Sequence, residues 1–162
     1  MNAIKIILQL IFIQFLFSQF HHVNISYEHN EMTIKDEKVY ILESFNDIVQ
    51  NYYSFNNFSN DYELLDVPLN IHIIYHNINF SDNNKYDNID CQILYSNNYG
   101  QYHMTKILEL PYYKGRDIYY NAMHFDPISS LFDYYAYIFI ANELDTYGIF
   151  LGDSYYNKAF EL

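Results

Sequence analysis

Two alternating runs decide the fold: Pro68-Leu69-Asn70-Ile71-His72-Ile73-Ile74-Tyr75-His76 and Ile89-Asp90-Cys91-Gln92-Ile93-Leu94-Tyr95. In each run, every second residue from Leu69 or Ile89 is apolar, which is typical of a strand with one buried face. The polar cluster between them predicts a turn. We expect further strands at Val23–Tyr27, at about Tyr102–Leu110 and, more weakly, at Asp117–His124. Together these strands predict an antiparallel meander.

Helices are predicted on both sides of this strand region. Residues Val39, Leu42, Phe45, Val49 and Tyr52 form one apolar stripe, which indicates an amphipathic helix over Asp36–Tyr53. Asp126-Pro127 is typical of a helix start, with Asp as the cap and Pro in the first turn. The aromatic run Leu131–Ala141 that follows is apolar on nearly all sides, so we expect this helix to be buried centrally. A last helix is expected from Asp153 to Leu162. The predicted fold class is α+β, with an N-terminal amphipathic helix and a buried aromatic C-terminal helix packed on the meander sheet.

Composition narrows the functional classes. The chain has 162 residues, a formal charge of -12, 20 Tyr and 13 Phe. Only 8 Lys and Arg accompany 20 Asp and Glu, which argues against nucleic acid as a partner. The single cysteine, Cys91, excludes an internal disulfide framework and a multi-cysteine zinc module. Its place in an alternating apolar run predicts a buried and inert thiol.

The first 19 residues are predicted to be a secretory signal peptide. Lys5 supplies the positive charge, Ile6–Phe17 the apolar segment, and Ser18-Gln19 a cleavage zone before Phe20. An uncleaved anchor is the alternative, but about 12 apolar residues fall short of the ~20 that a spanning helix needs. Residues 20–162 are predicted to form a single α+β domain. Without Lys5, 7 basic and 20 acidic residues remain, a formal charge of -13.

The segment Ser129–Leu162 is the most distinctive. It contains Tyr135-Ala136-Tyr137-Ile138, then Asn142-Glu143-Leu144-Asp145-Thr146-Tyr147, then Gly152-Asp153-Ser154-Tyr155-Tyr156. This segment resembles a family of exported Bacteroidetes proteins that includes the type IX secretion protein PorD. The departures are Ala141 for Gly, Glu143 for Asp and Asp153 for the second Gly of a pair, and family members continue beyond the length of this chain.

The resemblance implies an exported protein without enzymatic activity that serves type IX secretion. Its implied partners are other envelope or secretion-system proteins, and its implied location is the periplasm or the periphery of the outer membrane. No cofactor is expected. The residues singled out for an interaction or structural motif are Tyr135, Tyr137, Glu143, Asp145, Tyr147, Gly152 and Tyr155.

Alternative functions stay open at this point. A secreted hydrolase or carbohydrate-binding protein would use exposed tyrosines and Asp145, and Gly148–Ser154 imitates the nucleophile block of one esterase class. No His follows Ser154, however, so we favour Asp153 or Ser154 as a helix cap. Asp145 is expected to brace the loop that follows it. His72 and His76 would lie ~13 Å apart on a strand, too far to share a metal ion. A defunct truncated copy is the third possibility; it would expose an apolar face.

Overall fold

We describe the fold from a computed structural model that places residues 18–59, 65–80, 87–112, 116, 118 and 126–162. The elements in chain order are β1 (Val23–His29), the 3-10 turn η1 (Asp36–Lys38), α2 (Val39–Phe55), β2 (Leu69–Phe80), β3 (Asp87–Ser96), β4 (Tyr102–Met104), β5 (Leu108–Tyr112), α3 (Pro127–Tyr147) and α4 (Asp153–Phe160). Of the predicted leader, 1–19, only Ser18 and Gln19 lie within the described residues, and both are buried.

The sheet is mixed, so the predicted antiparallel meander is wrong for its first strand. The predicted hairpin of β2 and β3 is present and antiparallel, with Ile73 opposite Ile93. β1 pairs with β2 in parallel, from Val23 opposite Leu69 to His29 opposite Tyr75. The reason is the connection: α2 carries the chain back across the sheet before β2 begins, so the two strands run in the same direction.

The third predicted strand is divided in two. β4 pairs with one end of β3 and β5 with the other, both antiparallel. Between them, Thr105 keeps contact with β3: its hydroxyl accepts the Ile93 N–H at 2.9 Å, and its own N–H donates to the Ile93 carbonyl at 3.0 Å. The expected fourth strand, 117–124, lies outside the described residues except for Ile118, which is not in a strand.

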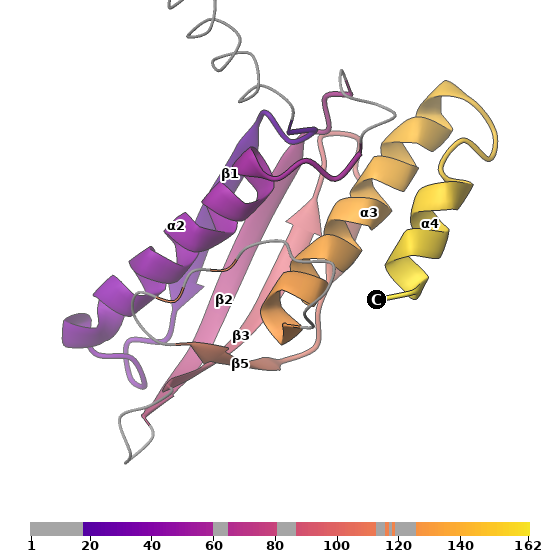
Figure 1. The fold of residues 1–162 in the computed structure, drawn as a ribbon. Helices are drawn as coiled ribbons and strands as arrows, with labels where there is room; N and C mark the ends of the chain where they lie inside the picture. Colours follow the sequence, from indigo (N-terminus) through magenta and orange to yellow (C-terminus); the bar gives the residue numbers. More distant parts are fainter. Residues whose placement is uncertain (1–17, 60–64, 81–86, 113–115, 117, 119–125) are drawn as a thin grey trace, which may run out of the picture.

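One face of the sheet forms the core. The alternate residues of β2 and β3 that the sequence pattern singled out are buried, from Leu69 to Tyr75 and from Ile89 to Tyr95. Figure 1 shows α2 and α3 lying over this face, with α4 beyond α3. Cys91 lies on the same face, and burial raises the pKa of its thiol to about 12, which agrees with the predicted inert cysteine.

The opposite face carries polar cross-strand pairs. The Asn24 amide donates to the Asn70 side-chain oxygen at 3.0 Å, and Ser26 Oγ lies 2.8 Å from His72 Nδ1. His76 Nε2 lies 3.1 Å from Gln92 Oε1. A register shift in β2 occurs at His76, between Tyr75 and Asn77. The two histidines therefore serve separate neighbours within the sheet.

The two helices over the core are joined by buried polar contacts. The Tyr52 hydroxyl of α2 donates to Asp133 Oδ1 of α3 at 2.6 Å, and the Tyr53 hydroxyl donates to the Phe132 carbonyl at 3.1 Å. Burial raises the pKa of Asp133 to about 6, although the bond from Tyr52 acts in the opposite direction. These contacts fix where α3 crosses α2.

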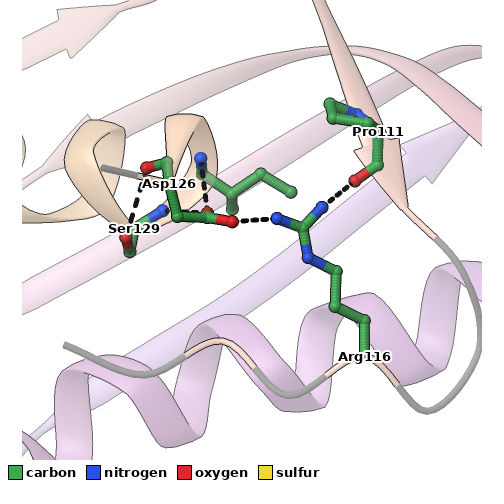
Figure 2. Close-up of polar contacts among 5 residues, drawn as sticks. Pro111, Arg116, Asp126 and Ser129 are labelled. Atoms are coloured by element: carbon green, nitrogen blue, oxygen red, sulfur yellow. Dashed lines mark hydrogen bonds and ion pairs between the residues drawn. The ribbon is translucent and has the colours of Figure 1, made fainter. Parts of the chain in front are cut away.

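Asp126 starts α3 as the sequence predicted. Its Oδ1 accepts the N–H groups of Ile128 and Ser129, both at 3.0 Å. Its Oδ2 pairs with Arg116, whose other terminal nitrogen donates to the Pro111 carbonyl at the end of β5 (Figure 2). Arg116 thus ties the end of the sheet to the start of α3.

The capping contact can be separated from the ion pair. Replacing Asp126 with Ala removes both and should lower the free energy of unfolding by about 1–2 kcal/mol. Asp126→Asn keeps an oxygen acceptor for the cap and loses only the partly exposed ion pair, so we expect a loss below about 1 kcal/mol. Urea unfolding followed by circular dichroism measures both. Equal losses in the two variants would contradict a capping role.

Asp133 should impose a pH dependence on stability. Its pKa is raised from the usual 3.8 to about 6, so the folded state holds this proton more tightly than the unfolded state. The contribution of the protonated carboxyl to the free energy of unfolding is therefore fully present below pH 4 and is lost as the pH rises through 6. Asp133→Asn keeps an acceptor for Tyr52 but does not titrate. Relative to the native chain, this variant should therefore gain stability between pH 4 and 7, by up to about 2 kcal/mol. Urea unfolding at several pH values measures this. If the free energies of unfolding of the two proteins change equally with pH across this range, the effect is ruled out.

Candidate functional site

The residues singled out from the sequence lie on α3, on α4 and in the loop between them, which we call the α3–α4 hairpin (residues 127–160). α3 is longer than its aromatic run suggested. It continues to Tyr147, so Glu143 and Asp145 are helical. α4 begins at Asp153, as predicted, and packs along α3. α4 stands on the side of α3 away from α2 (Figure 1).

Gly152 allows the two helices to approach each other. A Cβ at this position would lie 2.9 Å from the Cα of Ala141 and still closer to the Ala141 carbonyl. Real side chains do not tolerate such contact with a backbone, so the site requires a residue without Cβ. The expected cap of α4 by Asp153 or Ser154 is wrong, because Gly152 occupies the cap position and neither side chain caps the helix. Ser154 lies exposed in the first turn.

Asp145 braces the loop between the helices. Its Oδ1 accepts the Gly152 N–H at 2.8 Å, seven residues further along the chain. A carboxylate in the last turn of a helix is disfavoured by the helix dipole, and this N–H partner offsets the cost. The contact agrees with the bracing role that we expected, and it holds Gly152 in place against α3.

Tyr155 and Tyr137 belong to the core rather than to an exposed surface. The Tyr155 hydroxyl is hydrogen-bonded to the Ser59 hydroxyl, and its ring lies under Lys158, whose Nζ is 4.3 Å from the ring centroid. Tyr137 meets Phe58 edge-on at 6.3 Å. α4 is thereby connected to the segment 57–59 that follows α2.

Tyr135 points toward the sheet. Its ring is stacked on that of Tyr95 of β3, with centroids 4.1 Å apart and planes at 16°. The His103 ring of β4 lies 6.3 Å from it. Tyr135 is half-buried, and its role is to pack α3 on the sheet.

Glu143 and Tyr147 form a pair one helical turn apart. Glu143 is buried, and within the described residues its Oε2 has no hydrogen-bond partner. A hydrogen bond with Glu143 raises the pKa of Tyr147, and the negative charge of the carboxylate adds to the effect. Tyr147 is the one residue of the predicted motif whose ring is largely exposed, at 69%.

The loop beyond Tyr147 carries three consecutive exposed apolar side chains. The exposed fractions are 84% for Ile149, 75% for Phe150 and 43% for Leu151. Phe150 adopts a φ of 66°, a left-handed conformation that is unusual for a bulky residue. We call Tyr147 and Ile149–Leu151 the apolar tip. The left-handed backbone is a cost to folding, and the exposed side chains gain no stability from burial; both features are typical of a recognition element.

The described residues bring together no group of three or more His, Cys, Asp or Glu that could hold a metal ion. None of the helices in the described ranges combines the length and the apolar character needed to cross a bilayer. What the hairpin offers chemically is an apolar contact surface on a braced loop, with the exposed carboxylates of Asp145 and Asp153 beside it.

Sequence reasoning missed several residues that shape this region. The exposure of Ile149–Leu151 has no sequence signal, because a short apolar stretch in a loop can equally be covered by another part of the chain. Asp133 gave a clear signal, since it is the one acid in the apolar run 131–141. Gln19, which binds the segment 57–59, gave none. Tyr99 lies exposed between β3 and β4, whereas Tyr112 is buried in β5.

Comparisons with known proteins give no further guide: no family model matches the chain, and no curated protein or solved structure is significantly similar to it.

The close approach at Gly152 can be tested with its neighbour as control. Gly152→Ala places a methyl group against the α3 backbone and should lower the free energy of unfolding by about 1–3 kcal/mol. Gly148→Ala meets only the flexible Leu151 side chain, at 3.0 Å, and should cost less than about 1 kcal/mol. Chemical unfolding of both variants gives the comparison. If the two substitutions cost the same, the packing argument fails.

Proposed function

We propose that this protein is an exported, non-enzymatic binding component of the bacterial envelope that serves type IX protein secretion. The resemblance over Ser129–Leu162 supplies the secretion route. The apolar tip carries the binding role, because it places Tyr147 and Ile149–Leu151 in solvent at the end of a rigid helical hairpin. Exposed apolar side chains gathered in one place are typical of interaction sites.

The surroundings of the tip favour a protein partner with a basic rim. Asp145 and Asp153 are exposed on either side of the loop, and the whole chain has a formal charge of -12. These charges oppose contact with an anionic surface and fit an apolar pocket edged by Lys or Arg. Association should therefore weaken as salt screens the charges, while the apolar contact persists.

The partner in this proposal is another envelope or secretion-system protein in the periplasm or at the periphery of the outer membrane. Nucleic acid is not proposed as a partner, since the charge has the wrong sign. Asp145 serves the tip indirectly: through its bond to Gly152 it fixes the base of the loop.

Deletion of the gene tests the secretion role. We expect proteins carrying type IX sorting domains to leave the culture medium and to accumulate in the periplasm, and a plasmid copy should restore their export. Quantitative proteomics of both fractions measures this. Unchanged cargo in the medium would contradict the proposal.

The apolar tip can be tested in the same strain. Ile149→Ser combined with Phe150→Asn removes the apolar surface, and Asn tolerates the left-handed backbone at position 150. Loss of two apolar side chains that the partner would bury should weaken partner binding at least tenfold and abolish complementation. Phe55→Ser, an equally exposed aromatic at the end of α2, is the matched control and should complement. A role for the tip would be contradicted if the double variant still co-purified with its partner. It would also be contradicted if Phe55→Ser failed to complement while the double variant complemented.

A further inference from the structure

The first two described residues, Ser18 and Gln19, are built into the domain. Gln19 is fully buried, and its carbonyl accepts the Val67 N–H at 2.7 Å. This bond lies just ahead of the ladder between β1 and β2, which begins with Val23 opposite Leu69. Phe20 follows, also fully buried, with its ring edge-on to those of Tyr53 and Phe58, both at 5.5 Å.

The side chain of Gln19 holds the segment 57–59 in place. Its Nε2 donates to Asn57 Oδ1 and to the Ser59 carbonyl, both at 3.0 Å, and its Oε1 accepts the Phe58 N–H at 2.9 Å. The Ser59 hydroxyl in turn meets Tyr155 of α4. A chain beginning at Phe20 would lose the four bonds that Gln19 makes to Asn57, Phe58, Ser59 and Val67, and buried backbone groups that lose their partners are costly. The fold therefore requires Gln19.

The residues that leader cleavage needs give a second, independent limit on where the leader ends and the mature protein begins. Leader cleavage sites follow an A-x-A-like pattern, with small residues one and three positions before the cut. A cut after Ser18 meets the first of these positions and places Leu16 at the other. Within the stretch Gln14-Phe15-Leu16-Phe17-Ser18-Gln19-Phe20, Ser18 is the one small residue. The next small residue downstream, Ser26, lies inside β1, and a cut there would remove half of that strand.

Both limits meet at one bond, and we infer that the leader is removed between Ser18 and Gln19, so that Gln19 is the first residue of the mature protein. Water adds to the Ser18 carbonyl carbon, the C–N bond breaks, the leader leaves with the new carboxylate, and Gln19 gains the amine. The cut costs the two bonds of the Ser18 hydroxyl, to the Tyr53 carbonyl at 2.5 Å and from the Phe20 N–H at 3.1 Å. A cut after Gln19 would cost the four bonds of its side chain and carbonyl as well, so the earlier cut is the less costly of the two. This inference rests on the proposed export and places the leader boundary one residue earlier than the sequence alone suggested.

The mature terminus can be measured directly. The full chain is expressed in an exporting host, recovered from the periplasm or medium, and examined by intact mass and peptide mapping. We expect a chain beginning at Gln19, whether its terminus is open or has cyclised with loss of ammonia. A terminus at Phe20 or later, or at Ser18 or earlier, overturns the inference and leaves export intact. A full-length chain retained in the cytoplasm overturns both the inference and the proposed export.

Two substitutions at the predicted cut separate peptidase specificity from folding. Ser18→Ala keeps a small residue and should be processed like the native chain. Ser18→Phe should not be cut at this bond, and the precursor should accumulate several-fold. If Ser18→Phe is cut before Gln19 as efficiently as Ser18→Ala, the assigned specificity is wrong.

The folding requirement is tested on chains released with defined ends. A chain starting at Phe20 should unfold at a clearly lower urea concentration than one starting at Gln19. His22→Ala in the longer chain, an exposed neighbour, is the control and should leave the midpoint unchanged. Equal midpoints for the two chains would overturn the claim that Gln19 is required.

Discussion

α3 must be covered on every side, and the rest of the structure follows from this constraint. Its aromatic and aliphatic residues face in all directions, so exposure of any side would cost several kcal/mol. The sheet covers one side, where Tyr135 stacks on Tyr95. α2 covers a second, with Tyr52 and Phe132 rings 5.2 Å apart. α4 covers a third, and it can come close because Gly152 has no side chain.

Polar groups decide where these apolar surfaces meet. Burial of apolar area is not directional, so many helix placements would bury similar areas. The bond from Tyr52 to Asp133 and the cap at Asp126 distinguish among them, because a buried polar group without its partner is costly. Asp133 adds a cost of its own near neutral pH. Its partner Tyr52 offsets part of that cost, and the pair sets the register of α3 on α2.

The same division between packing and polar anchoring describes the hairpin. Most of the residues that the sequence singled out hold α3 and α4 together: Tyr137 and Tyr155 through their rings, Asp145 and Gly152 through one hydrogen bond and a close backbone contact. These contacts support the loop between α3 and α4, in which Phe150 has a left-handed backbone. Of the exposed apolar side chains at this end of the hairpin, Tyr147 belongs to the predicted motif, whereas Ile149–Leu151 lie beside it.

The sequence by itself determined the positions of the β2–β3 hairpin, of α2 and of the start of α3, and the burial of Cys91, because these depend on local periodicity and capping chemistry. It predicted the brace at Asp145 for a similar reason. Only the tertiary structure decided that β1 runs parallel to β2, that one predicted strand is divided at Thr105, that Gln19 holds the segment 57–59, and that Ile149–Leu151 are exposed. Alternation marks the buried side of a strand and carries no information on its direction or partner. Likewise, the apolar character of a loop residue does not reveal whether another part of the chain covers it.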